Sequence, residues 1–286
     1  MGCASSIPTT IRRDDRAVQL GWFVTVRATG RPPAVRFGAV AERIPHDDWA
    51  QWYDAIYEAT YGDAYRWLTD ETLRAVLEKA CPGDAILDIG AATGRLSVPL
   101  AAAGYRVHAV DRSPSMLRQL LARATESRVG QRITVQCVNA RELDGAPTFD
   151  LALCVFTVLL YLPDRAALAD TLAAIASRLR IGGRLLLDVP RRELFVGYRA
   201  ETDQVERLVQ ITPDPSDSDG RRFSYRDDAF LKSPFLVRVS EHFVATWWPE
   251  HEVLEEATAA GLELESDVSP RFTRAASAHW WLRRHR

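Results

Sequence analysis

Short apolar runs alternate with amphipathic stretches from Ala85 onward. Each run has the length of a strand, and the stretches between the runs place apolar residues at helical spacing. This alternation is typical of a parallel sheet that is covered by helices on both faces. We predict five strands, at 85–89, 106–110, 133–137, 151–155 and 184–189. We predict helices between them near 95–103, 115–124 and 165–179.

Beyond Pro190 polar and apolar residues alternate along the chain, on either side of an acidic, turn-rich break at 213–220. Such alternation predicts antiparallel strands with one buried face. We therefore predict an antiparallel insertion over 191–248. Its strands are expected at 205–211, 222–226 and 236–246. The chain is then expected to return to the main sheet through a helix over 249–260 and strands over 262–268 and 278–283.

Aromatic residues crowd the segment before the predicted sheet, and Trp49, Trp52 and Tyr53 fall at helical spacing. A further helix is expected over 71–79, with Thr69 before it as the N-terminal cap. The fold class that these patterns predict is α/β, with a doubly wound, mostly parallel sheet, an antiparallel C-terminal strand and a small antiparallel insertion. We divide the chain into an N-terminal extension at 1–43, an aromatic-rich helical segment at 44–80 and a main domain at 81–286.

The composition is that of an ordinary globular protein. Of its 286 residues, 47% are hydrophobic and 26% are charged, and no apolar run approaches the roughly 20 residues that a membrane helix needs. We therefore expect no membrane span. The formal net charge of -2 also lacks the basic excess that is typical of proteins that bind nucleic acids. We expect no nucleic-acid partner.

The four cysteines are scattered, without the paired spacing of a zinc site or a disulfide framework. This pattern favours a reducing compartment, and we expect a cytoplasmic protein without a metal centre. The opening Met-Gly-Cys-Ala-Ser-Ser matches the short pattern for N-myristoylation, with Gly2 as the acceptor and Cys3 as a palmitoylation site. We favour an accidental match, because so short a pattern recurs by chance.

The predicted first strand runs directly into a turn of small residues that opens a helix. Gly90 and Gly94 let the backbone approach a ligand closely, and the N–H groups of the helix favour a carboxylate or a phosphate. A dinucleotide-binding turn would need glycine where Ala92 and Arg95 stand. The spacing instead fits an acidic residue, Asp88, two positions before the first glycine.

This turn resembles the first motif of the class I S-adenosylmethionine-dependent methyltransferases, acidic-x-Gly-x-Gly-x-Gly, with Ala92 in place of the middle glycine. The resemblance implies a Rossmann-like domain with S-adenosyl-L-methionine as its cofactor. It continues at the end of the second strand, where Asp111 would accept both ribose hydroxyls and Arg112 follows. After the third strand, Asn139 and Ala140 stand where family members recognise the adenine amine.

In this family the loop after the fourth strand is where cofactor and acceptor meet, and the resemblance places Phe156 beside the methyl group. The Asn/Asp-Pro-Pro-Tyr signature of methyltransferases that act on nucleic-acid amines is absent from this strand end, as is a Pro-Cys nucleophile, and both absences favour a small acceptor. Leu179-Arg-Ile-Gly-Gly resembles the family's Leu-Arg-Pro-Gly-Gly turn, so the likeness extends from about residue 47 to the C-terminus. The cofactor contacts that it implies are Asp88, Gly90, Ala91, Gly94, Asp111, Arg112, Asn139, Ala140 and Phe156.

The function that this resemblance implies is transfer of a methyl group from S-adenosylmethionine to an O, N or C atom of a small molecule by in-line displacement. Positioning supplies much of the catalysis, and the sequence assigns no catalytic base. The candidates for contact with the acceptor are Tyr53, Tyr161, His242 and Trp247. Two alternatives stay open: a nicotinamide- or nucleotide-dependent enzyme on a similar fold, and a non-catalytic, lipid-anchored module that binds the cofactor. A homodimer is compatible with the sequence.

Overall fold

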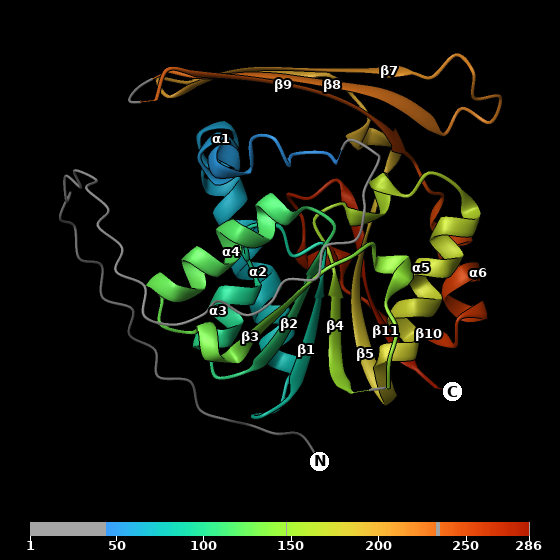
Figure 1. Ribbon diagram of the computed structural model, residues 1–286. Helices are drawn as coiled ribbons and strands as arrows, with labels where there is room; N and C mark the ends of the chain where they lie inside the picture. The colour runs from blue at the N-terminus through green and yellow to red at the C-terminus, as the bar shows by residue number, and fades with distance from the viewer. Residues whose placement is uncertain (1–43, 147, 233–234, 286) are drawn as a thin grey trace. The chain divides into compact units, whose positions relative to one another are not determined.

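The computed structural model describes residues 44–146, 148–232 and 235–285. The main sheet contains β1 (Ala85–Ile89), β2 (Arg106–Asp111), β3 (Ile133–Cys137), β4 (Phe149–Cys154), β5 (Leu179–Pro190), β10 (Leu262–Asp267) and β11 (Ser277–Arg284). These seven strands lie in the order β10-β11-β5-β4-β1-β2-β3 (Figure 1). Neighbouring strands from β5 to β3 are parallel, whereas β11 runs antiparallel to both β5 and β10.

Helices cover both faces of the main sheet (Figure 1). One face carries α2 (Asp63–Lys79), α3 (Ser97–Ala102) and α4 (Pro114–Glu126), and the other carries α5 (Arg165–Arg178) and α6 (Glu250–Ala259). Successive strand residues point to opposite faces, so the all-apolar start of β1 serves two cores. Leu87 packs into the core that contains Leu172 of α5, and Ile86 into the core that contains Leu120 of α4.

A second, antiparallel sheet is inserted in sequence between β5 and β10 and is drawn across the top of Figure 1. Its strands lie in the order β6-β7-β8-β9, with bounds β6 (Tyr198–Glu201), β7 (Val205–Pro213), β8 (Arg222–Leu231) and β9 (Val237–Thr246). Val205 of β7 and Ala229 of β8 pack with Ile56 of α1 (Tyr53–Tyr61), which the short turn η1 (Ala50–Trp52) precedes. Arg207 and Asp227 form a fully buried ion pair within this sheet.

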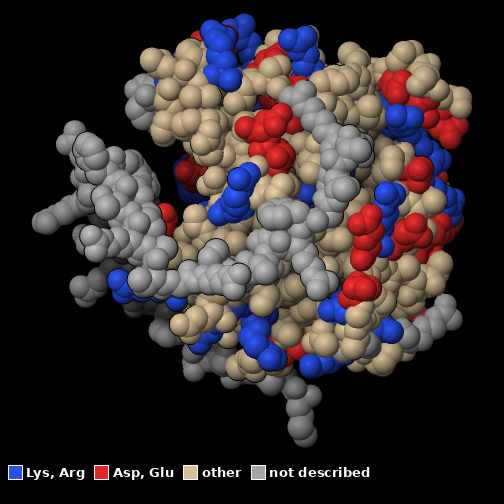
Figure 2. All heavy atoms as spheres, in the orientation of Figure 1, with Lys and Arg blue, Asp and Glu red and all other residues tan. Residues whose placement is uncertain are grey.

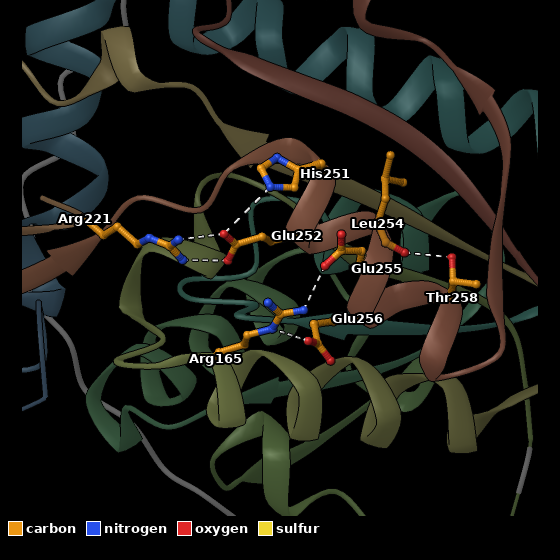
Figure 3. A network of polar contacts seen from close by, with 8 residues as sticks. All are labelled: Arg165, Arg221, His251, Glu252, Leu254, Glu255, Glu256 and Thr258. Carbon is orange, nitrogen blue, oxygen red and sulfur yellow. Dashed lines mark hydrogen bonds and ion pairs between the residues drawn. The ribbon is translucent and has the colours of Figure 1, made fainter. Parts of the chain in front are cut away.

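Ion pairs tie α6 to the rest of the protein (Figure 3). Arg165 at the start of α5 binds Glu255 and Glu256, and Arg221 just before β8 binds both oxygens of Glu252 at 2.6 and 2.7 Å. Figure 2 shows acidic and basic atoms side by side on this part of the surface. The helix that leads from the second sheet back into the main sheet is therefore fixed to both. Within the described residues, no helix is both long and apolar enough to cross a membrane.

The structure confirms the predicted fold class, because the main sheet is mostly parallel with an antiparallel C-terminal strand and a small antiparallel sheet is present. Two local predictions are wrong. Thr69 is not a cap, because α2 already begins at Asp63 and the Thr69 hydroxyl donates to the Tyr65 carbonyl inside the helix. The sequence analysis also places no strand at β6, because its four residues, although they alternate between apolar and polar, are too short a run to indicate a strand. The domain bounds stay predictions, and residues 1–43, with Gly2 and Cys3, lie outside the described residues.

Candidate functional site

A cavity of about 560 Å³ lies at the carboxyl ends of β1, β2 and β4. This volume is within the range of small-molecule sites. In doubly wound sheets, ligands bind where the strand order reverses, and here the order reverses at β1, which lies between β2 and β4. Segment 44–46 and Tyr225 and Phe243 of the second sheet form other walls. The cavity therefore lies between the two sheets.

The turn after β1 uses backbone conformations that few residues adopt. Gly90 and Gly94 have φ values of 69° and 85°, and Ala92 between them has a φ of 46°, which costs a residue with a Cβ about 1–2 kcal/mol. A Cβ at Gly90 would lie 2.5 Å from Val158 Cγ2, and one at Gly94 would lie 2.8 Å from Leu120 Cγ. Neighbouring side chains thus leave no room for a Cβ at either position.

Asp111 ends β2 and lines the cavity beside this turn. Its Oδ2 accepts the Ala92 N–H at 2.9 Å, and its Oδ1 accepts the Ser113 N–H at 2.8 Å. Burial raises the pKa of this carboxyl, although both N–H donors oppose the shift. A carboxylate oxygen can accept two hydrogen bonds. Each oxygen of Asp111 therefore keeps the capacity to accept a ligand hydroxyl.

Two buried carboxyls also line the cavity. Burial raises the pKa of both Asp88 and Asp188 to about 7. Asp88 accepts the Ser97 hydroxyl at 2.6 Å, and the two oxygens of Asp188 accept the Thr157 N–H at 3.0 and 3.1 Å. Phe156 and Thr157 both have left-handed φ values, of 64° and 68°. Asp188 therefore holds a strained loop in place after β4.

These pKa values predict how stability depends on pH. An aspartate in an unfolded chain titrates near pH ~3.9, so between that pH and about 7 the folded protein binds more protons than the unfolded chain. Stability from Asp188 is therefore expected to fall as pH rises through this window, by at most about 1.4 kcal/mol per pH unit. Asparagine does not titrate. The free energy of unfolding of Asp188→Asn, measured with urea, should therefore rise relative to that of wild type between pH ~4 and pH ~7. A difference that does not change with pH would contradict the assignment.

Arg95 contributes a half-buried positive charge to the cavity. Its guanidinium carbon lies 3.6 Å from the centroid of the Tyr65 ring and 3.8 Å from that of Phe156. Its Nε donates to the Thr69 hydroxyl and its Nη2 to the Tyr65 carbonyl, both at 2.6 Å. Burial lowers the pKa of Arg95, and Asp54 interacts with it electrostatically, although Arg95 forms no ion pair with the described residues. Such a cation favours an anionic ligand group.

The structure brings together most of the residues that the resemblance assigns to the cofactor. Gly94 does not line the cavity, because it faces Leu120 of α4. Asn139 lines it, and the Asn139 amide oxygen also accepts the Arg141 N–H at 3.3 Å, which caps the short turn η3 (Ala140–Glu142). The residues of the set that line the cavity are Asp88, Gly90, Ala91, Asp111, Arg112, Asn139, Ala140 and Phe156.

Of the candidates for acceptor contact, Tyr53 and Tyr161 line the cavity, whereas His242 and Trp247 do not. His242 lies on the exposed face of β9, where its Nε2 is 2.8 Å from the Ser224 hydroxyl. Its neighbour Phe243 faces the cavity instead, because successive strand residues point to opposite faces. Predictions that His242 and Trp247 contact the acceptor are therefore not supported by their positions.

Aromatic side chains form much of the remaining wall. Tyr53 stacks on Tyr57 with ring centroids 4.3 Å apart, and Tyr225 stacks on Phe243 with centroids 4.7 Å apart. The sequence carries a signal for part of this wall, since tyrosines recur every four residues from position 53 to 65, which places them on one helical face. The aromatic residues that line the cavity are Tyr53, Tyr57, Tyr61, Tyr65, Phe156, Tyr161, Phe195, Tyr198, Tyr225 and Phe243.

Sequence reasoning misses several polar residues of the site, among them Arg95, His46 and Asp188, and it also misses Glu241, which contacts His46. His46 lines the cavity and contacts Tyr161 and Glu241. Residues 46 and 241 are 195 positions apart, so no local pattern could pair them.

Comparisons with known proteins agree with this arrangement. A family model described as a methyltransferase domain matches residues 86–183, which include the turn after β1, Asp111 and Asn139. A putative methyltransferase of Geobacillus sp. (strain WCH70) is 31% identical over 148 residues, which cover 51% of this chain and 58% of that protein. The chain therefore contains a methyltransferase domain, and its motifs resemble those of the class I S-adenosylmethionine-dependent methyltransferases. S-adenosylmethionine is the cofactor that this resemblance implies.

A ubiquinone biosynthesis O-methyltransferase of Xanthomonas axonopodis pv. citri (strain 306) is 31% identical over 157 residues, or 55% of this methyltransferase and 60% of that protein. The chain thus spans less than two thirds of the length of these curated relatives. The solved structure of an S-adenosylmethionine-dependent methyltransferase from Clostridium acetobutylicum ATCC 824 matches with a TM-score of 0.70 and 17% identity, covering 84% of this chain and 99% of that one.

The sugar N-methyltransferase KedS8 from Streptoalloteichus sp ATCC 53650 matches with a TM-score of 0.63 and 20% identity. This match covers 91% of the methyltransferase chain and 99% of the KedS8 chain. At these identities the likeness to solved structures shows a shared fold. The cavity residues fit the cofactor's groups, because Asp111 can accept further hydrogen bonds and Arg95 forms no ion pair among the described residues.

Proposed function

We propose that the methyltransferase moves the methyl group of S-adenosylmethionine to a small molecule held against the aromatic wall. The observation that carries this proposal is that Asp111, Arg95 and the aromatic side chains line one cavity. The names of the relatives, which refer to ubiquinone biosynthesis and to a sugar, also favour a small acceptor over a nucleic acid.

Each end of the cofactor has a suitable partner in the cavity. Asp111 is proposed to accept the two ribose hydroxyls, for which its oxygens have free capacity. Asn139 and Ala140 are proposed to lie beside the adenine, since both line the cavity at the end of β3. Arg95 is proposed to bind the amino-acid carboxylate, and Phe156, whose ring Arg95 contacts, to lie beside the methyl group.

When bound, the cofactor supplies an activated methyl group on its sulfonium. The protein must then hold the acceptor in line with that group and exclude water, and positioning of this kind contributes on the order of 7–11 kcal/mol. The aromatic wall serves both needs, because large rigid side chains bury apolar surface and hold a ligand in few orientations. The second sheet supplies Tyr198, Tyr225 and Phe243 to this wall. We propose that the acceptor binds between these residues and Phe156.

The demethylated cofactor should stabilise the folded protein. S-adenosylhomocysteine at a hundred times its Kd adds about 2.7 kcal/mol, which is expected to raise the melting temperature by about 5–10 °C. NADH is expected to leave it unchanged, since the turn lacks the glycines of a dinucleotide site. A shift with NADH and none with S-adenosylhomocysteine would favour the nicotinamide alternative.

Release of S-adenosylhomocysteine should then be screened across hydroxyl- and amine-bearing metabolites, with product masses as confirmation. Turnover of any of them supports the proposed activity. Binding of the cofactor without turnover of any acceptor, together with acylation of Gly2 or Cys3 in the intact mass, would favour the non-catalytic module instead.

A further inference from the structure

A row of three polar side chains runs from the cavity wall into the protein. His46 Nε2 is 2.8 Å from the Tyr161 hydroxyl, and His46 Nδ1 is 2.6 Å from Glu241 Oε2, although the angle of this second contact is poor for a hydrogen bond. The other oxygen of Glu241 accepts the backbone N–H of His46. His46 and Tyr161 line the cavity, whereas Glu241, on β9, does not. Both His46 and Glu241 are buried.

Several contacts fix His46 in this place. Its φ of 66° is a left-handed conformation that a side chain disfavours, and such strain persists only where the surroundings hold it. The next residue, Asp47, accepts the Ser113 hydroxyl at 2.5 Å and the Ser115 N–H at 3.0 Å, which anchors the segment to the start of α4. Trp49 packs edge-on against the His46 ring, with centroids 5.0 Å apart. The ring is therefore held rigidly beside the cavity.

The environment sets where the protons lie. Burial opposes the ionisation of Glu241, but its contacts with His46 outweigh burial and lower the pKa of this carboxyl. Burial raises the pKa of Tyr161 well above its usual value. At neutral pH, Glu241 is thus ionised and Tyr161 keeps its proton. The negative charge of Glu241 favours a proton on Nδ1 of His46, which leaves Nε2 as the acceptor for the Tyr161 hydroxyl.

The other groups around His46 preserve this arrangement. Tyr53 and Tyr57 of α1 face the ring, with centroids 5.5 and 6.5 Å away, and burial raises the pKa of both, that of Tyr57 to about 12. Both phenols therefore stay neutral. Charged groups near His46 include Asp47, the next residue, Asp111, which interacts electrostatically with His46, and Arg112, which lies 5.8 Å from the centroid of the Tyr161 ring.

We propose that Tyr161 and His46 form a proton relay that accepts the proton of an acceptor hydroxyl, so that the methyltransferase forms O-methyl products. This inference rests on the proposed function. A lone pair of the acceptor oxygen forms the new O–C bond while the C–S bond breaks and its electron pair goes to sulfur. The acceptor's proton passes to Tyr161 Oη, the Tyr161 proton passes to His46 Nε2, and the positioning residue Glu241 stabilises the imidazolium. Water takes the proton after the product leaves.

A hydroxyl acceptor needs such a relay more than an amine does. An attacking hydroxyl that kept its proton would become a strongly acidic oxonium, so its proton must leave as the O–C bond forms. A neutral amine instead gives a stable ammonium product, which can lose its proton to water later. A rigid proton acceptor inside an aromatic cavity is therefore suited to oxygen, and transfer of this kind contributes about 10²–10⁴-fold to the rate.

The proton positions can be tested without an acceptor. Long-range ¹H–¹⁵N spectra distinguish the two neutral tautomers of histidine from the cation, and the loss of signals in His46→Gln assigns residue 46. The relay requires a proton on Nδ1 and none on Nε2 of His46, both alone and with S-adenosylhomocysteine bound. Glu241→Gln should lower the fraction of this tautomer, whereas His242→Gln, on the outer face of the same strand, should not. A cationic His46, or a proton on Nε2, would overturn the relay.

The kinetic arm uses hydroxyl acceptors from the S-adenosylhomocysteine release screen, each beside its amine analogue. Tyr161→Phe and His46→Gln are expected to lower kcat for the hydroxyl acceptor by about 10²–10⁴-fold while KM and the affinity for S-adenosylhomocysteine change little. His242→Gln should keep the wild-type kcat. Unchanged kcat in both relay variants, or methylation of amines but not of hydroxyls, would overturn this inference and leave the proposed methyl transfer intact. Absence of turnover with every acceptor would instead contradict the proposed function.

Discussion

Replacement of Asp111 by alanine is expected to weaken the binding of S-adenosylhomocysteine by about a hundred- to ten-thousandfold. Hydrogen bonds to a charged group are worth about 1.5–3 kcal/mol each, so two bonds from the ribose hydroxyls give about 3–6 kcal/mol. Each 1.4 kcal/mol changes Kd about tenfold. The effect is large because both oxygens of Asp111 are already held in place by backbone N–H groups, so the carboxylate needs no rearrangement to bind. Isothermal titration calorimetry of wild type and Asp111→Ala measures the Kd of S-adenosylhomocysteine.

A ligand that lacks one hydroxyl makes this test specific. Wild type should bind the 2′-deoxy analogue of S-adenosylhomocysteine more weakly than the parent compound, whereas Asp111→Ala should lose most of that difference. Asp150→Asn is the matched control, because Asp150 binds Ala85 and Arg180 at the opposite edge of the sheet. Its affinity should stay that of wild type. If Asp111→Ala binds normally, the ribose is held elsewhere.

The main sheet could be predicted because each of its strands can be recognised from the pattern of its own residues. A parallel strand that is buried on both faces is mostly apolar, and β1, which is buried throughout, has the predicted bounds. The position of Asp111 follows from the same logic. Adjacent parallel strands end at the same edge, so an acid at the end of β2 must lie near the turn after β1. Sequence therefore predicts which residues line this side of the cavity.

The acceptor side depends on contacts that no local pattern contains. His46 meets Glu241 only because the second sheet folds over the segment before α1, which brings together residues 195 positions apart. The prediction for His242 fails for a related reason. His242 and Phe243 are neighbours in β9, and only the register of the sheet decides which of them faces the cavity. Thr69 was misplaced as a cap because α2 continues through it, and its hydroxyl bonds within the helix.

Loss of the Arg95 guanidinium should remove the preference of the methyltransferase for ligands that carry an amino-acid carboxylate. Wild type is expected to bind S-adenosylhomocysteine about 10- to 100-fold more tightly than 5′-methylthioadenosine, which has no carboxylate. Arg95→Leu is expected to bind the two with similar Kd. The reason is that this cation, stacked on Tyr65 and Phe156, forms no ion pair within residues 44–146, 148–232 and 235–285. Calorimetric titration of S-adenosylhomocysteine and of 5′-methylthioadenosine into wild type and into Arg95→Leu measures the four Kd values.

The comparison of two ligands separates a lost contact from a damaged fold, since a damaged site would weaken both. Arg95→Lys should give an intermediate preference, because lysine keeps the charge but cannot stack its ammonium on the two rings or donate in the same plane. Arg106→Leu removes an exposed guanidinium from the opposite end of β2 and should keep the full preference. If Arg95→Leu still prefers S-adenosylhomocysteine, the carboxylate is bound by the N–H groups of the turn after β1, and the charge of Arg95 is available for an anionic group on the acceptor.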